Sequence, residues 1–262
     1  DGVKMNDSFG LGSNGYPTIR MPFSYDALSQ VTVEIAPFDV IYSGFTGCNI
    51  NAVTKTGTNE IHGGAFYDYG SDSLQGDSLE GDSIASPSYS DKRYGFNVGF
   101  PLLKDTVFGF VSYEKYEGSS IFTRGAIGSG AINEVGLRQE DLDEIVRISN
   151  ELYQYDPGPV PTSIPEEDEK LLVRLDWNIN DAHRLSYTYN YNDGNFFAES
   201  DGDLNEFELQ NHLYEVGTEL QSHVLSLYSD WNDKFSTEIR YSYLDVDNRQ
   251  NSLENQTGAV GG

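Results

Sequence analysis

The stretch RLSYTYNYND, residues 184–193, alternates between two kinds of side chain as far as Asn192. Leu185, Tyr187, Tyr189 and Tyr191 share one parity, and small or polar residues occupy the other. Successive side chains of a β-strand point to opposite faces. This stretch therefore predicts a strand with one aromatic face and one polar face.

Six further stretches show the same period of two, and aromatic residues again gather on one parity. They are Ile61–Tyr69, Arg93–Phe100, Val107–Glu117, Lys170–Ile179, Leu213–Asp230 and Phe235–Asp247. Aromatic residues make up 13% of the chain, which argues against a disordered protein. The sequence therefore predicts an all-β protein with about seven main strands.

The connections between these stretches alternate in length. Lys104-Asp105, Asn180-Asp181 and Asn232-Asp233 are short turns, whereas long loops are expected at about 70–92, 118–169 and 194–213. All the short turns fall at one end of the predicted sheet, as in outer-membrane barrels. A soluble acidic β-sandwich that binds carbohydrate, with the same aromatic residues as its core, is the competing interpretation.

The charge follows this division. Lys and Arg number 16 and Asp and Glu number 42, so the net charge is −26. Segments 68–92, 139–170 and 193–219 hold 24 acids and 3 bases, a net of −21, which leaves −5 for the rest. This balance excludes a nucleic-acid binder. The acidic loops are either a solvated rim or a field that attracts cations.

One helix is expected inside the longest loop, over residues 139–155. Leu142, Ile145, Val146, Leu152 and Tyr153 fit helical spacing, and acids crowd its start, where the helix dipole favours them. We expect Asp156-Pro157 to end it. It is interpreted as a surface feature of the loop, with a partner-binding helix as the alternative.

The segment QVTVEIAPFDVIYSGFTGCNINAVTKTGTNEIHGGAFYDY, residues 30–69, resembles the junction of plug and barrel in TonB-dependent outer-membrane receptors. The likeness is greatest to the Oar-like branch. Cys48 and Thr56 depart from the family's Gly and Ser. The positions that carry the resemblance are Gly47, Asn51, Thr54, Lys55, Gly57, Thr58, Asn59, Glu60, His62 and Gly63.

Three later motifs are similar to the family's first barrel strands and occur in the family's order. They are GFPLLKD at 99–105, FGFVSYE at 108–114 and LVRLDWNIND at 172–181. The resemblance extends from the N-terminus to the 240s, although the loops match poorly.

The resemblance implies a partial transmembrane antiparallel β-barrel, the first strands of about 22, preceded by part of an α/β plug. Residues 1–60 would be the plug part, and residues 61–262 the barrel part. We expect the chain to be a piece of a longer protein, because so few strands cannot close such a barrel. The joint residues would seat the plug through polar contacts. Alternatively, Asn51, Thr54 and Lys55 would belong to the plug face that moves when TonB pulls. Leu185, Tyr187, Tyr189, Tyr191, Tyr241 and Tyr243 would face lipid.

The function implied is plug-gated active uptake of a scarce, unknown substrate across the outer membrane of a Gram-negative bacterium. The expected partners are the TonB complex, through a segment upstream of this chain, the external substrate and outer-membrane lipid. The alternative is an outer-membrane structural or interaction protein, for adhesion, export or partner binding, without transport.

No enzyme chemistry is expected. The sequence has neither a G-x-S-x-G elbow nor a P-loop, its four histidines lack metal-ligand spacing, and Cys48 is its single cysteine. No cofactor is predicted, with one weak exception. Asp201, Asp203 and Asn205 fit the first positions of a calcium loop, but Glu206 replaces the required Gly.

Overall fold

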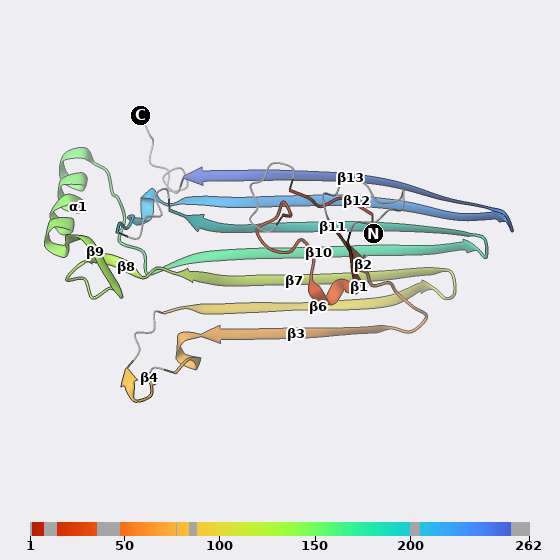
Figure 1. Cartoon of the computed structure of the whole chain (residues 1–262), viewed down its shortest axis with the longest axis horizontal. Coiled ribbons are helices and arrows are strands. Elements are labelled where there is room, and N and C mark those ends of the chain that lie inside the picture. The colour runs from red at the N-terminus through yellow and green to blue at the C-terminus, as the bar shows by residue number, and fades with distance from the viewer. Residues whose placement is uncertain are drawn as a thin grey trace.

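The computed structural model describes residues 2–7, 15–35, 48–76, 78–83, 88–199 and 205–252. Its main feature is one seven-stranded antiparallel sheet, which confirms the predicted fold class (Figure 1). The sheet is open, with β3 and β13 at its edges. In spatial order the strands are β13 (Phe235–Ser252), β12 (Tyr214–Asn232), β11 (His183–Ala198), β10 (Ser163–Asn180), β7 (Val107–Ile121), β6 (Ser90–Leu103) and β3 (His62–Ser71).

Short turns join β6 to β7, β10 to β11 and β12 to β13, and all lie at one end of the sheet (Figure 1). We call this the turn end and the opposite one the loop end. Asp105 adopts a left-handed conformation with φ of 62° in the first turn. The side chains of Asn180 and Asn232 accept backbone hydrogen bonds in the other two turns. The three predicted turns are therefore confirmed.

The strands run further into the loop end than alternation predicts. β7 continues to Ile121 and β10 begins at Ser163, so the predicted 118–169 loop is too long. Glu166–Glu169 is acidic on both faces, yet it pairs with β7 and β11 throughout. Backbone pairing extends these strands beyond the apolar band, and an apolar–polar pattern carries no signal there.

Several short helices and strands lie at the loop end (Figure 1). α1 begins at the predicted residue and ends at Tyr153, just short of the prediction, because Gln154 is left-handed with φ of 52°. No helix of the described ranges has the length and apolarity to cross a membrane. The elements are η2 (Asp72–Leu74), β4 (Ser78–Leu79), β5 (Asp82–Ser83), β8 (Arg124–Ile127), β9 (Asn133–Arg138), α1 (Gln139–Tyr153) and η3 (Gln210–His212).

The N-terminal segment, residues 15–35 and 48–60, crosses the middle of the sheet and, after β2, runs towards the turn end (Figure 1). It contains η1 (Tyr25–Ala27) and the antiparallel pair β1 (Leu28–Ile35) and β2 (Cys48–Thr54). Ala27 of η1 forms a buried apolar cluster with Phe110 and Leu172 of the sheet. This cluster anchors the segment on the sheet.

The two faces of the sheet differ in polarity. We call the face under the N-terminal segment the covered face and the other the open face. On β11, the buried covered-face residues are polar, whereas the half-buried open-face residues are apolar or aromatic. A soluble β-sandwich has the opposite arrangement, with its apolar side chains buried between sheets. The covered-face residues of β11 are Ser186, Thr188, Asn190 and Asn192, and the open-face residues are Leu185, Tyr187, Tyr189 and Tyr191.

Candidate functional site

A buried ion-pair network on the covered face holds the N-terminal segment. Lys170 Nζ lies 3.0 Å from Glu114 Oε1 and 2.7 Å from Asp168 Oδ1. Arg93 Nη2 lies 3.0 Å from Glu114 Oε2, and Ser24 Oγ donates to that oxygen at 2.7 Å. Glu114, Asp168 and Lys170 are all buried. Buried charges are costly without partners, so the network fixes where Ser24 sits.

A second polar contact joins the segment to β10. Arg174 donates from Nη1 to Thr54 Oγ1 at 2.9 Å. The same guanidinium makes a two-point ion pair with Asp176, at 2.9 and 3.0 Å. Asn190 of β11 donates from Nδ2 to the Pro22 carbonyl at 3.0 Å. The segment is thus tied to three neighbouring strands, β7, β10 and β11.

Four of the predicted joint residues, Thr58, Asn59, Glu60 and His62, lie where the segment meets the first strands. Asn59 and Asp105 exchange two hydrogen bonds, from Asn59 Nδ2 at 2.6 Å and from the Asp105 N–H at 2.8 Å. Thr58 Oγ1 donates to the Glu60 carbonyl at 2.9 Å and lies 3.2 Å from His62 Nδ1.

Other joint residues act within the segment. The Lys55 N–H donates to the Ala27 carbonyl at 2.8 Å, and Asn51 pairs with Thr32 between β2 and β1. Gly47 lies outside the described residues. Plug seating by these residues stays a prediction.

Gly57 lies in close contact with the backbone of the sheet. A Cβ atom there would lie 2.4 Å from the Gly109 carbonyl oxygen and 2.7 Å from that of Phe100. Both are backbone atoms, which cannot rotate away. Only glycine fits this contact.

The open face carries the predicted lipid-facing side chains. Tyr241 and Tyr243 of β13 are well exposed, and Tyr187 lies in hydrogen-bonding distance of His223, with 2.8 Å between its hydroxyl and Nδ1. The rings of Tyr189 and Tyr243 also approach His223, at 5.0 and 6.3 Å between centroids. Contact with lipid stays a prediction for these residues. Strand parity alone would place His223 on this face.

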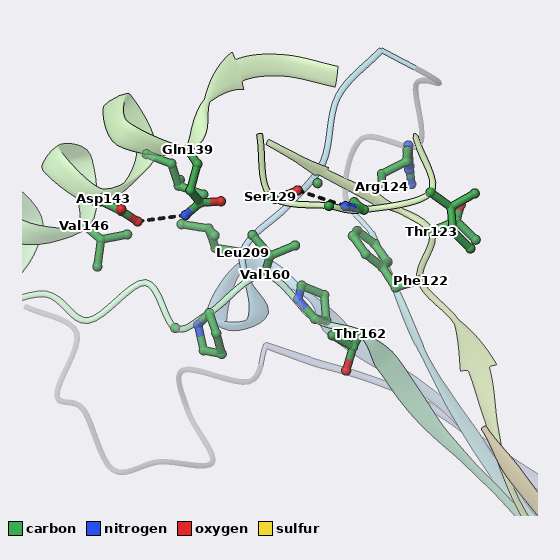
Figure 2. Close-up of a pocket in the computed structure, with 18 of the residues that line it drawn as sticks. Phe122, Thr123, Arg124, Ser129, Gln139, Asp143, Val146, Val160, Thr162 and Leu209 are labelled. Atoms are coloured by element: carbon green, nitrogen blue, oxygen red, sulfur yellow. Dashed lines mark hydrogen bonds between the residues drawn. The ribbon is translucent and has the colours of Figure 1, made fainter. Parts of the chain in front are cut away.

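The loop end contains a hollow of about 950 Å³ between α1, β8 and the chain before β10. Figure 2 shows Gln139, Asp143 and Val146 of α1 on one side, Phe122 and Arg124 on the other, and Val160 and Leu209 between them. Arg124 is ion-paired with Glu199. Sequence reasoning missed this hollow. The apolar spacing of α1 was its only signal, since Leu142 and Val146 line it.

The predicted calcium-binding residues lie mostly outside the described residues. Asp201 and Asp203 lie outside the described residues, and Asn205 is in a turn. No group of three or more His, Cys, Asp or Glu side chains suited to a metal ion occurs in the described part of the chain. Calcium binding stays a prediction.

Comparison with known proteins gives one family match and two relatives. Residues 53–125 match the family model described as an outer membrane beta barrel domain. The chain is 34% identical over 122 residues to a protein named probable TonB-dependent siderophore receptor PirA from Acinetobacter baumannii, covering 45% of this chain and 14% of that protein. It is 25% identical over 200 residues to the TonB-dependent transporter Oar of Myxococcus xanthus, covering 72% of this chain and 17% of that protein. No solved structure matches.

These matches indicate the outer membrane of a Gram-negative bacterium. Both relatives are named as receptors or transporters, and neither as an enzyme. The chain spans less than a fifth of the length of either relative.

Proposed function

Because this chain is a relative of the TonB-dependent outer-membrane receptors, we propose that it belongs to an active transporter gated by its N-terminal segment. External loops capture a scarce substrate, and the segment obstructs the passage beside the covered face. Interaction with TonB then moves the segment so that the substrate reaches the periplasm.

The observation that carries this proposal is the polar seat of the N-terminal segment. Ser24 and Thr54 bind charged covered-face residues, and the buried network beneath them is hydrophilic. Besides the apolar contact of Ala27 with Phe110 and Leu172, the seat consists of hydrogen bonds and ion pairs. These can be exchanged for contacts with water once the segment shifts, whereas a wholly apolar interface would lose its burial energy. Such a contact suits a part that is held firmly and also moves.

The alternative is an outer-membrane interaction protein without transport. One observation favours it: α1 projects from the loop end and exposes Leu152 and Tyr153 at 74% and 76%. Large exposed apolar side chains close together are typical of a protein-binding surface.

Growth on scarce nutrients distinguishes the two functions. The gene for the complete protein is deleted in its host, and growth is compared on limiting iron complexes, cobalamin, oligosaccharides and peptides. A transporter predicts a growth defect on at least one nutrient, reproduced by deleting tonB. Normal growth on every nutrient, with a defect only in attachment or partner binding, would contradict the transport proposal.

A further inference from the structure

The loop-end hollow has the size and lining of a ligand site. Its volume of about 950 Å³ lies near the top of the range of about 300–1,000 Å³ usual for small-ligand pockets. Phe122, Leu142, Val146 and Val160 provide apolar walls from three different parts of the 122–162 region. A ligand in this hollow therefore carries apolar groups.

The charged groups of the hollow favour a cationic ligand. Two carboxylates, Asp143 and Asp156, line it. The one lining cation of the described residues, Arg124, is ion-paired with Glu199. The stretch of sequence that contains both carboxylates, residues 139–170, holds ten acids and two bases. An anionic ligand would meet repulsion here, and a cationic one attraction.

The apolar lining continues out of the hollow along α1. Leu142 and Val146 line it, and Ile145, Leu152 and Tyr153 extend the same helical stripe while 49%, 74% and 76% exposed. From Leu142 to Leu152 the stripe is about 15 Å long at the helical rise of about 1.5 Å per residue. An extended peptide of about five residues covers that length at about 3.3 Å per residue.

We propose that this hollow and the adjoining stripe of α1 bind a short extended peptide that carries both basic and apolar side chains. The apolar side chains occupy the hollow and cover Leu152 and Tyr153, and the basic ones face Asp143 and Asp156. This inference rests on the proposed uptake function, since it names the substrate class.

The opposite side of α1 supplies a matched control. Arg147 pairs with both Glu144 and Glu151 there, and this contact lowers the pKa of the Glu144 carboxyl. Glu144 does not line the hollow, although it adjoins Asp143 in sequence. Asp143→Asn and Glu144→Gln thus each remove one negative charge from α1, the first inside the proposed site and the second outside it.

The test measures binding of a fluorescent Lys-Leu-Lys-Leu-Lys peptide to the complete protein in detergent at physiological salt. We expect saturable binding, and no binding of Glu-Leu-Glu-Leu-Glu. Asp143→Asn should weaken binding about fivefold, the effect of losing one partly exposed ion pair. Glu144→Gln should change it by less than about twofold.

A second pair of variants tests the stripe. Leu152→Gln should weaken binding about fivefold, because a contact of exposed leucine with an apolar ligand side chain is lost. Leu74→Gln, at a similarly exposed loop-end leucine in η2, should leave binding unchanged. Heat-dependent migration in electrophoresis verifies that each variant is folded.

Three results would overturn the inference: no saturable binding of the basic peptide, equal binding of the acidic peptide, or equal effects within each variant pair. Peptide binding does not require TonB, so the binding test and the growth test can fail independently of each other. If growth is lost in the tonB mutant but the peptide does not bind, the proposed substrate class is wrong and the transport function stands. If the peptide binds but no growth depends on TonB, the proposed transport function is wrong and the peptide site stands.

Discussion

Lys170 is the side chain on which the covered-face network depends. Its ammonium lies between two buried carboxylates, those of Glu114 and Asp168. Removing one partner of a buried ion pair leaves an uncompensated charge, which costs far more than the pair contributes. Ser24 binds one of these carboxylates, so the same cation also supports the seat of the N-terminal segment.

Replacing this cation should destabilise the protein strongly. Lys170→Met is expected to lower the free energy of unfolding by about 3 kcal/mol or more. Lys115→Met is the control, because Lys115 pairs with Glu117 and Glu167 on the open face and all three are solvent-accessible. Its effect should stay within about 1 kcal/mol. Urea unfolding in detergent measures both, and equal losses would refute the special role of Lys170.

Gly57 gives a second test at a single position. Gly57→Ala places a methyl group against two backbone carbonyls, which must shift the segment at a cost of about 2 kcal/mol. Gly64→Ala in β3 is the control, because the nearest atom to its new methyl would be 3.9 Å away. The free energy of unfolding and the rate of protease cleavage within residues 48–60 are compared between the two variants. An unaffected Gly57→Ala protein would show that the segment is not held closely.

The sequence predicted Thr54 and Asn59 as contact residues, but not their partners Arg174 and Asp105. Strand parity indicates that Arg174 lies on the polar face. It does not indicate which residue, 120 positions away, lies opposite. The network around Lys170 was likewise not predictable from the sequence, because its members come from three strands and only the sheet register brings them together.

Among the elements, the strands were predictable, but how far they extend into the loop end was not. Alternation works where one face is apolar, and it stops near the loop end, where both faces are polar. α1 was predictable because its apolar spacing is helical over its length. β8 and β9 are short and pair in parallel, and no local pattern marks such a pairing.

The open face of β10 allows a matched test of lipid contact. Leu175 pairs with Tyr187 in the middle of the apolar band, and Ile179 lies four residues nearer the turn end on the same face. Their exposures are 40% and 41%. Leu175→Arg should destabilise the membrane-inserted protein by about 2–4 kcal/mol, and Ile179→Arg by about 1 kcal/mol or less. Equal effects in a lipid-bilayer unfolding assay would contradict a lipid-facing band.

Considered as a whole, the described part of the chain forms an open sheet with β3 and β13 as its edge strands. Backbone groups exposed to hydrocarbon cost several kcal/mol each. The edges must therefore pair with further strands when the sheet lies in a membrane.

Residues 1–262 alone, secreted to the periplasm, should fail to insert as a stable monomer. We expect aggregation or degradation, with the complete protein, expressed identically, as the inserted control. Fractionation and heat-dependent migration in electrophoresis are the measurements. A folded, membrane-inserted monomer of residues 1–262 would contradict the partial barrel.

The proposed uptake requires the N-terminal segment to move, and the accessibility of Ser24 tests this movement directly. Ser24 is only 3% exposed at its seat on Glu114. A complete protein carrying Cys48→Ser and Ser24→Cys is expressed in a strain with functional TonB and in a tonB-deleted strain. Both strains are supplied with the nutrient found by the growth test and are treated with an impermeant maleimide. Leu152→Cys on exposed α1 serves as the control that reacts in every strain. We expect rapid labelling at position 24 with functional TonB and slow labelling without it. Equal labelling rates in the two strains would contradict it.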